Sequence, residues 1–377
     1  MKTVKRNILL TPGPATTTNS VKLAQVVSDI CPRVPEFGQL LVNISTELTR
    51  LVSDPDRYTT VLFGGSGTAA VESMISSVLG EKDLAVIINN GAYGKRMCEI
   101  ANAYGFRFLQ FTSTPVDAID LDALEAFIKS SRQTITHLAV VHHETTTGLL
   151  NDIEAIGQLC KLYEIDLLVD AISSYAAIPI DMEKMNIRYL ASSSNKNLQG
   201  MAGVSFVISE KNKLKSLKYK KTKNYYLNLY EQHRFFSEYQ QMRFTPPVQT
   251  LYALQKALEE LKQEGVKNRY QRYVKSWETL IAGITNLGLT YIVPETCHSK
   301  LVTAIVEPDQ DDYDFQKMHD YFYERGITIY PGKLDSLKTF RVANIGDITF
   351  EDIEMFLELL DRYLGSLDHK KRKGVNG

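Results

Sequence analysis

Short apolar runs that alternate with amphipathic helical patterns constrain the fold of this chain more than any other feature. The runs lie at residues 61–63, 84–88, 138–142, 167–169 and 204–208. Between the first two, apolar residues recur at helical spacing at Val71, Met74, Ile75, Val78 and Leu79. Strands that are separated by helices form a mostly parallel sheet with helices on both faces. We therefore predict an α/β large domain built on a mostly parallel sheet.

The pattern changes toward the C-terminus. A long helix is expected after Pro246 and Pro247, and the change begins at about Val274. Strand-like residues then occur at 290–293, 301–306 and 327–330, followed by a closing helix at 350–364. These elements predict a smaller α+β domain at residues 271–366, joined by an N-terminal segment at 1–20, with the large domain at 21–270. Residues 367–377, with a basic run at 369–373, are expected to form a disordered tail.

Composition gives no reason to expect a nucleic-acid or membrane partner. The formal net charge of the 377 residues is -1, and no apolar segment is long enough to span a bilayer. The cysteines are widely scattered, at Cys31, Cys98, Cys160 and Cys297. Their spacing is typical of neither a metal site nor a disulfide framework, so we expect no metal and a reducing cytoplasm. The few residues before Asn7 leave room for a further domain upstream.

Several predicted strands end in polar, ligand-type residues. Residues 64–68 (Gly-Gly-Ser-Gly-Thr) follow one strand and open a helix, where backbone amides and the helix N-terminus favour a phosphate. Residues 90–94 and 143–148 follow two other strands and contribute an aromatic side chain, Tyr93, and a group of hydroxyls. Each motif alone is also typical of an ordinary turn or helix cap. Because open α/β sheets bind ligands at the carboxyl ends of their strands, the motifs together predict a binding site there.

Asp170 and Lys196 indicate which chemistry this edge supports. Asp170 ends the apolar run 167–169, and Lys196 follows the next apolar stretch, which begins at Tyr189. Pyridoxal phosphate uses an aspartate that keeps its ring nitrogen protonated and a lysine that forms a Schiff base. A lone lysine is most often a solvated surface residue. The pair beside a phosphate-type loop therefore predicts pyridoxal 5'-phosphate as the cofactor.

The order and spacing of these motifs resemble the class V, fold-type I pyridoxal-phosphate aminotransferases. The resemblance runs from residues 10–14 (Leu-Thr-Pro-Gly-Pro) to the closing helix and includes residues 64–68, 90–94, 144–148, 170–174, 194–196, 325–327 and 340–342. It implies a large domain with a seven-stranded type of sheet, a smaller C-terminal domain, and a homodimer with shared active sites.

Within this family, the chain is most similar to the members that exchange an amino group between 2-aminoethylphosphonate and pyruvate. The discriminating segments are residues 11–14 with the threonines at 16–18, the Glu-Thr-Thr-Thr-Gly motif at 144–148, and Asn195 before Lys196. The implied reaction gives phosphonoacetaldehyde and L-alanine by a ping-pong mechanism through a Lys196 Schiff base. Both substrates are small anions.

The resemblance also implies roles for individual residues. Lys196 is implied as the Schiff-base lysine and acid/base, and Asp170 as the partner of the ring nitrogen. The implied cofactor contacts are Ser66, Gly67 and Thr68 at the phosphate, Tyr93 and Ile172 on the two ring faces, Thr145 near the ring hydroxyl, and Thr245 at the phosphate of the neighbouring subunit.

Arg341 is the first candidate for binding the substrate anion, because a guanidinium binds carboxylate or phosphonate in a bidentate manner. An ion pair within the protein is the alternative. Arg33 and Thr17 are further candidates for substrate binding, and a loop salt bridge and a plain polar loop also explain them.

Other functions stay open at this point. A serine–pyruvate or alanine–glyoxylate aminotransferase would share every cofactor residue and differ in the substrate-facing loops. A cysteine desulfurase would need a mobile nucleophilic cysteine in the smaller domain, where only Cys297 lies, and usually a histidine in place of Asn195. A cofactor-binding protein without catalytic activity is disfavoured because the lysine, the aspartate and the arginine are all retained.

Overall fold

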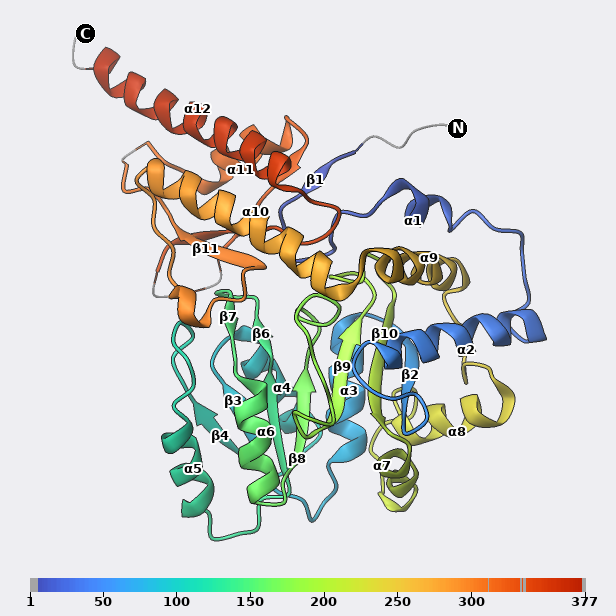
Figure 1. Cartoon of the computed structure of the whole chain (residues 1–377). Coiled ribbons are helices and arrows are strands. Elements are labelled where there is room, and N and C mark those ends of the chain that lie inside the picture. The colour runs from blue at the N-terminus through green and yellow to red at the C-terminus, as the bar shows by residue number, and fades with distance from the viewer. Residues whose placement is uncertain (1–5, 311, 333, 335–336, 375–377) are drawn as a thin grey trace.

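A seven-stranded sheet forms the centre of the large domain (Figure 1). The computed structural model describes residues 6–310, 312–332, 334 and 337–374, with side chains to residue 367. In spatial order the strands are β2 (Tyr58–Gly64), β10 (Val204–Glu210), β9 (Ile187–Ser193), β8 (Asp166–Asp170), β5 (His137–Val141), β3 (Ala85–Asn89) and β4 (Phe108–Thr112). β10 is antiparallel to both of its neighbours, and the other neighbouring pairs are parallel. The prediction of a mostly parallel sheet is confirmed.

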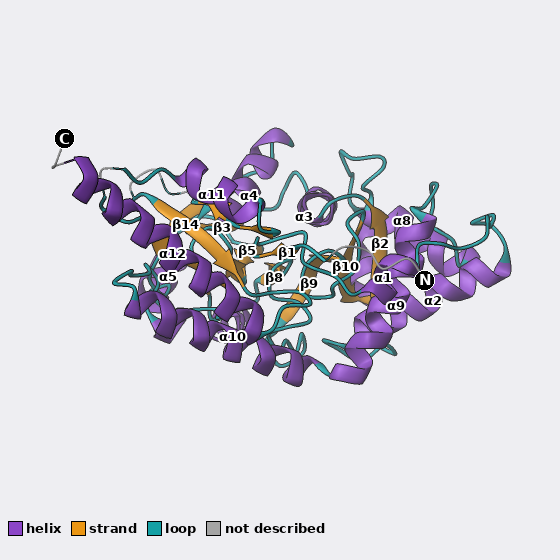
Figure 2. Cartoon of the chain, turned by 90° about the horizontal axis from the view of Figure 1, so that it is seen from above, coloured by secondary structure: helices purple, strands orange, loops and turns teal. Residues whose placement is uncertain are grey.

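Helices cover both faces of this sheet. Successive side chains of a strand point to opposite faces, so Leu167 and Val169 of β8 enter one core and Leu168 enters the other. The first core includes residues of α2 (Pro35–Arg50), α5 (Leu121–Ser130), α6 (Ile153–Leu162) and α9 (Val248–Glu264). The second includes residues of α3 (Gly67–Val78), α4 (Ala92–Ala103), α7 (Lys211–Ser216), η1 (Leu217–Tyr219) and α8 (Leu229–Tyr239). Figure 2 shows the strands in a row with α3 and α4 on one side. Because both faces are buried, the strand ends are what remains for a ligand.

The smaller domain packs above one end of the sheet in Figure 1. Its three-stranded sheet has the order β11 (Val302–Val306), β14 (Thr339–Ala343) and β13 (Tyr330–Pro331), with antiparallel pairs. Its helices are α10 (Val266–Asn286), η2 (Glu295–Cys297), α11 (Phe315–Tyr323) and α12 (Phe350–Gly374). Ile305, Phe340 and Phe356 lie in one core of this domain. The division expected between residues 270 and 271 falls inside α10, which follows α9 directly at Gly265.

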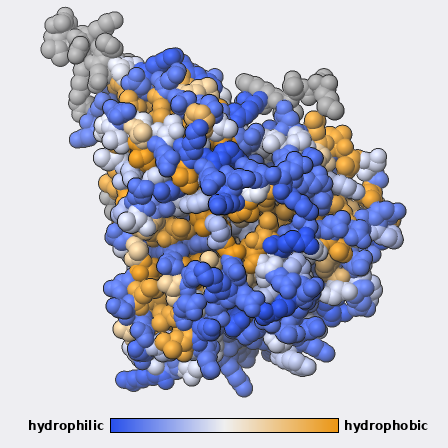
Figure 3. Space-filling model, viewed as in Figure 1, coloured by the Kyte–Doolittle hydropathy of each residue, from blue (hydrophilic) through white to orange (hydrophobic). Residues whose placement is uncertain are grey.

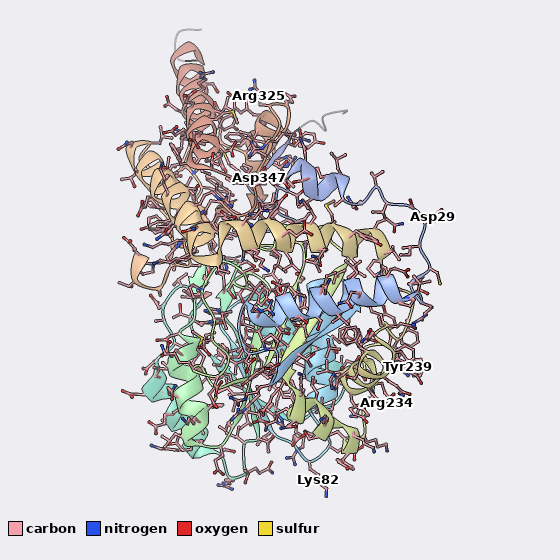
Figure 4. The ribbon with its side chains drawn as sticks, turned by 45° about the vertical axis from the view of Figure 1, so that its right-hand side comes forward. Asp29, Lys82, Arg234, Tyr239, Arg325 and Asp347 are labelled. Atoms are coloured by element: carbon pink, nitrogen blue, oxygen red, sulfur yellow. The ribbon has the colours of Figure 1, made fainter. Side chains whose placement is uncertain are left out.

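The N-terminal segment is attached to the smaller domain. β1 (Ile8–Leu9) pairs in parallel with β12 (Ile327–Thr328), and Ile8 and Leu10 are buried in the same core as Phe340. Arg6 donates to both carboxylate oxygens of Asp352 at 2.6 and 2.8 Å. Asp347, which Figure 4 labels in the upper part of the molecule, donates its backbone N–H to the carbonyl of Thr16 at 2.8 Å. α1 (Asn19–Leu23) then packs against α9 of the large domain.

The secondary structure differs from the expectation in a few places. β4 was not predicted, because this edge strand is largely exposed and lacks a continuous apolar run. Residues 290–293 form a single bridge, Tyr291 with Ile305, and Pro294, which lacks an N–H donor, ends the segment. The expected strand 327–330 divides into β12 and β13, which pair with β1 and β14 respectively. The tail expected to be disordered from residue 367 continues α12 to Gly374, and residues 375–377 lie outside the described part.

The face of the molecule seen in Figure 1 is largely polar. Figure 3 shows mostly hydrophilic residues on the face seen in Figure 1, with hydrophobic patches across the middle. Among the described residues, no helix combines the length and the apolar character that a membrane span requires. Tyr225 is 74 % exposed and Tyr226 is 42 % exposed, and both rings contact Phe244. This exposed aromatic group lies beside Gly64, whose carbonyl accepts a hydrogen bond from the Tyr226 hydroxyl at 3.2 Å.

Candidate active site

Asp170 and Lys196 meet at the carboxyl ends of two neighbouring parallel strands. Asp170 is the last residue of β8 and pairs with Ala191 of β9, and Lys196 follows the end of β9. Asp170 is 5 % exposed, and its Oδ1 accepts a hydrogen bond from the Ile172 N–H at 3.0 Å. Burial raises the pKa of Asp170 to about 6, and the positive charges of Arg96 and Lys196 oppose this shift. A cation bound beside Asp170 would therefore lower that pKa again.

A loop from the N-terminal segment contacts Lys196. The Lys196 ammonium donates a hydrogen bond to the carbonyl of Pro12. A Cβ on Gly13 would lie 2.6 Å from Cδ, Cε and Nζ of Lys196, and Gly13 has φ +140°, which side chains rarely adopt. The Thr-Pro-Gly-Pro opening therefore lies at the lysine, a contact that the sequence interpretation did not include.

The β2–α3 turn forms a glycine-rich cradle. Ser66 is the N-cap of α3, yet its side chain makes no capping hydrogen bond and is exposed. A Cβ on Gly67 would lie 2.7 Å from Cδ1 of Ile172, so the absence of a side chain brings Ile172 against the turn. The Thr68 hydroxyl accepts a hydrogen bond from Nη1 of Arg96 at 3.3 Å. Backbone amides at a helix N-terminus with two free or weakly used hydroxyls suit a phosphate.

Tyr93 lies in the first turn of α4, next to the same cradle. The guanidinium carbon of Arg96 lies 4.7 Å from the centre of the Tyr93 ring, which is a cation–π distance. Arg96 thus contacts both Tyr93 and Thr68, two of the predicted cofactor residues. Sequence reasoning assigned no role to Arg96, although it lies one helical turn after Tyr93.

Thr145 and Arg341 form the other wall. The Thr145 side chain is 1 % exposed, and its hydroxyl has no hydrogen-bond partner. Arg341, from β14, donates to the Thr145 carbonyl through Nη1 and to the Pro331 carbonyl through Nε, both at 2.9 Å. Its Nη2 is buried without a partner, and among the described residues no carboxylate forms an ion pair with it. Burial lowers the pKa of Arg341. A buried guanidinium with an unused nitrogen favours binding of an anion.

Three further predicted residues lie on other segments of the chain. Nη1 of Arg33 donates to the Met242 carbonyl at 2.7 Å and to Oε1 of Gln241 at 3.0 Å, so it holds the loop before α9. Thr17 is buried, and its carbonyl accepts a hydrogen bond from Lys22 at 2.8 Å. Thr245 is exposed on the loop before α9.

The residues that do converge fit pyridoxal phosphate. The partnerless Thr145 hydroxyl, the cradle at Gly67, the buried Asp170 carboxylate and the amine of Lys196 supply a set of contacts for each part of that cofactor. Among the described residues, no group of three His, Cys, Asp or Glu side chains could hold a metal ion.

Comparison with known proteins gives consistent matches. The model of the family described as aminotransferase class-V matches residues 20–344. The 2-aminoethylphosphonate–pyruvate transaminase of Klebsiella pneumoniae subsp. pneumoniae is 39 % identical over 362 residues, which are 95 % of this chain and 98 % of that protein. A bifunctional phosphonoacetaldehyde hydrolase/aminoethylphosphonate transaminase of Clostridioides difficile is 37 % identical, and the match covers 95 % of this chain but 56 % of that protein.

Solved structures agree on the fold. An alanine–glyoxylate aminotransferase from Nostoc sp. superposes with a TM-score of 0.89 at 27 % identity, covering 96 % of each chain. A cysteine desulfurase from Thermococcus onnurineus has a TM-score of 0.76 at 14 % identity, which is a likeness of fold alone.

Proposed function

Because the chain belongs to the class-V aminotransferases, we propose that it transfers the amino group of 2-aminoethylphosphonate to pyruvate, giving phosphonoacetaldehyde and L-alanine. The single observation that carries the proposal is the convergence of Asp170, Lys196 and the buried Arg341 at one end of the sheet. Similarity over nearly the full length of a 2-aminoethylphosphonate–pyruvate transaminase supports the choice of substrates.

Different residues would hold different parts of the cofactor. Pyridoxal phosphate supplies an electron sink that stabilises negative charge on the carbon bearing the amino group. Ser66, Gly67 and Thr68 would hold its phosphate, Tyr93 and Ile172 would enclose its ring, and the Thr145 hydroxyl would bond its ring oxygen. Asp170 would keep the ring nitrogen protonated, since a buried carboxylate beside a cation is held ionised. Lys196 would hold the cofactor covalently and, once released, carry a proton on Nζ to and from the substrate carbon.

Arg341 is the proposed anion site for both substrates. Arg341 is 1 % exposed, and its guanidinium carbon lies 5.0 Å from the ring centre of Tyr330, which is 38 % exposed. Its Nη2 is buried without a hydrogen-bond partner and is the nitrogen proposed to bind the anion. Hydrogen bonds to a charged group contribute about 1.5–3 kcal/mol each, which is a large share of the affinity for so small a substrate. Arg33 and Thr17 are proposed to contribute to substrate binding from outside this group.

A homodimer with shared active sites completes the proposal. The exposed Thr245 would contact the cofactor phosphate of the neighbouring subunit. In its support, Pro247 on the same loop lies within 3.4 Å of a Cβ built on Gly64, so the loop borders the cradle at the surface. The exposed rings of Tyr225 and Tyr226 on Phe244 give this border an apolar character that suits contact with a second copy. The four free cysteines favour a reducing compartment such as the cytoplasm.

An amino-donor panel tests the substrate. The cofactor-loaded protein is mixed with 2-aminoethylphosphonate, L-serine or L-alanine, and the absorbance change from the aldehyde to the amine form of the cofactor is followed. We expect a rapid change with 2-aminoethylphosphonate, reversed by pyruvate with formation of L-alanine. The Lys196→Ala protein is the control, and it should show no turnover. Conversion by serine or alanine but not by 2-aminoethylphosphonate would disprove the donor and leave the family unchanged.

Alanine–glyoxylate exchange is the second candidate, favoured by the 27 % identical structure that superposes over 96 % of each chain. The panel decides between the two when glyoxylate replaces pyruvate as acceptor. Cysteine desulfuration has less support, because burial raises the pKa of the Cys297 thiol and Asn195 precedes Lys196.

A further inference from the structure

Glu144 is a fully buried carboxylate that is not among the residues proposed to contact the cofactor. It lies at 0 % exposure in β6 (His143–Glu144), which forms a hairpin with β7 (Leu149–Leu150). Oε2 accepts hydrogen bonds from the backbone N–H of Tyr93 at 3.1 Å and of Gly94 at 3.4 Å. Oε1 accepts from the N–H of Thr146 at 3.2 Å and from its hydroxyl at 2.5 Å. Each of these contacts belongs to a segment that carries a predicted cofactor residue.

The first turn of α4 depends on this carboxylate. The N-cap of α4 is Gly91, which has no side chain to accept the free N–H groups of the first turn. The side chains of Thr146 and Glu144 accept them instead: Ala92 donates to the Thr146 hydroxyl at 3.3 Å, and Tyr93 and Gly94 donate to Glu144. A Cβ on Gly91 would lie 2.3 Å from Cδ of Glu144, so glycine is what makes room for the carboxylate. The backbone of Tyr93 is therefore held in place by a hydrogen bond to the 144–146 segment.

Thr145 is held from both sides by the same group. It lies between Glu144 and Thr146, whose side chains bond to each other, and its carbonyl accepts the hydrogen bond from Arg341. The position of the Thr145 hydroxyl thus depends on Glu144, as does that of the Tyr93 backbone. Burial raises the pKa of the Glu144 carboxyl, and the hydrogen bonds from Thr146, Tyr93 and Gly94 oppose that rise because they favour the carboxylate.

We propose that Glu144 is a positioning residue that locks Tyr93 and Thr145 into one rigid wall of the cofactor site. The inference rests on the proposed use of pyridoxal phosphate, but not on the identity of the amino donor. Glu144 touches neither cofactor nor substrate in this assignment, and it acts through the two residues that it holds. A carboxylate suits the task because it only accepts hydrogen bonds, and all four of its partners donate.

The Glu144→Gln variant tests the proposal with little change of shape. A glutamine replaces one accepting oxygen with an NH2 group, which faces N–H donors and loses their hydrogen bonds. We expect the dissociation constant of pyridoxal phosphate to rise about tenfold, since hydrogen bonds to a charged group are lost. At saturating cofactor, the visible circular-dichroism band of the bound cofactor should weaken, because the ring is no longer held in one orientation. Both measurements are made without an amino donor.

Asp120→Asn is the matched control. Asp120 is also a carboxylate at a helix N-terminus, accepting from the Ala123 N–H at 3.0 Å, but it is exposed on α5. This variant should bind the cofactor as the wild type does, with an unchanged visible band. If Glu144→Gln behaves like Asp120→Asn, then Glu144 is a helix cap only and the proposal is overturned.

A second variant covers the case in which Glu144→Gln fails to fold. Thr146→Val removes the hydroxyl that joins Ala92 to Glu144 and should raise the dissociation constant about threefold, with a weaker visible band. Wild-type values for Thr146→Val would then count against the lock. A wild-type protein that binds the cofactor tightly but does not convert 2-aminoethylphosphonate would refute the proposed substrate and leave the role of Glu144 standing.

Discussion

Replacing Asp170 with asparagine should stabilise the cofactor-free protein while abolishing its activity. Burial raises the pKa of Asp170 from its usual 3.8 to about 6, with Glu144 adding to the rise and Arg96 and Lys196 opposing it. The folded chain therefore keeps this proton to a higher pH than the unfolded chain does. Between pH 4 and pH 6, approximately, the unfolded state is the one that releases the proton, so stability falls as pH rises and stays lower above that window.

The size of the effect follows from the same shift. A rise from 3.8 to about 6 corresponds to about 3 kcal/mol at neutral pH, since one pKa unit is worth about 1.4 kcal/mol. Asparagine carries no charge at any of these pH values and still accepts the hydrogen bond from Ile172 through its oxygen. For a chain of 377 residues with a typical unfolding entropy, 3 kcal/mol corresponds to a rise of about 4 °C in Tm. At pH 5 the gain should be about half as large, because wild-type Asp170 is then mostly protonated in the folded state.

Thermal unfolding of the cofactor-free protein at pH 7.5 and pH 5 measures this difference. Asp152→Asn is the control, because Asp152 is an exposed N-cap of α6 and asparagine caps a helix equally well. With pyridoxal phosphate added, the order of the two Tm values should reverse. The wild type then gains more stability than Asp170→Asn, because the variant lacks the charge that pairs with the ring nitrogen. The reasoning would be refuted if the Tm of Asp170→Asn at pH 7.5 were no higher than that of the wild type, or if the gain in Tm were equal at both pH values.

Two further substitutions probe the walls of the site. Arg341→Gln should raise KM for the anionic substrates about 10- to 100-fold, because the lost hydrogen bonds to a charged group are worth about 1.5–3 kcal/mol. The spectrum of the bound cofactor should stay unchanged. Steady-state kinetics with an unaltered KM would contradict the anion site. Gly91→Ala should lower the free energy of unfolding by about 1–3 kcal/mol, because its Cβ would lie 2.3 Å from Cδ of Glu144. Gly365→Ala is the control and should not destabilise the protein, because a Cβ there has nothing within 4 Å. Equal Tm values for the two variants would contradict the close packing at Gly91.

The buried part of the sheet was predictable because burial on both faces leaves a continuous apolar run, as in residues 167–169 of β8. β4 was not predicted because it lies at the edge of the sheet, where Gln110 and Thr112 are exposed and interrupt the apolar run. Most of the residues proposed to bind the cofactor follow a strand, and their convergence could be predicted because parallel strands bring their ends together. The resemblance to a known family then supplied roles that spacing alone left open.

What sequence could not provide are contacts between segments far apart in the chain. The Thr-Pro-Gly-Pro segment is typical of a turn. Its contact with the distant Lys196, which donates a hydrogen bond to the Pro12 carbonyl, becomes visible only in the folded chain. Glu144 was part of a recognised motif, yet nothing in the order of residues says that its carboxylate replaces the missing cap of α4. Arg33 carries the charge of an anion ligand, and its hydrogen bond to the backbone carbonyl of Met242 could not be predicted from its residue type. Residue type predicts what a side chain can do, and the fold selects its partner.

The pairing of β1 with β12 has a consequence for how this protein is made. β1 is synthesised before its partner β12, and the whole large domain lies between them in the chain. Until β12 is synthesised, Ile8 and Leu10 have no core to enter, since the other members of that core follow residue 279. Closing so long a loop is entropically costly and slow, which makes this contact a late one in folding. The same N-terminal segment carries the Pro12 carbonyl that contacts Lys196, so the lysine should acquire its final surroundings only when β12 and the smaller domain have folded.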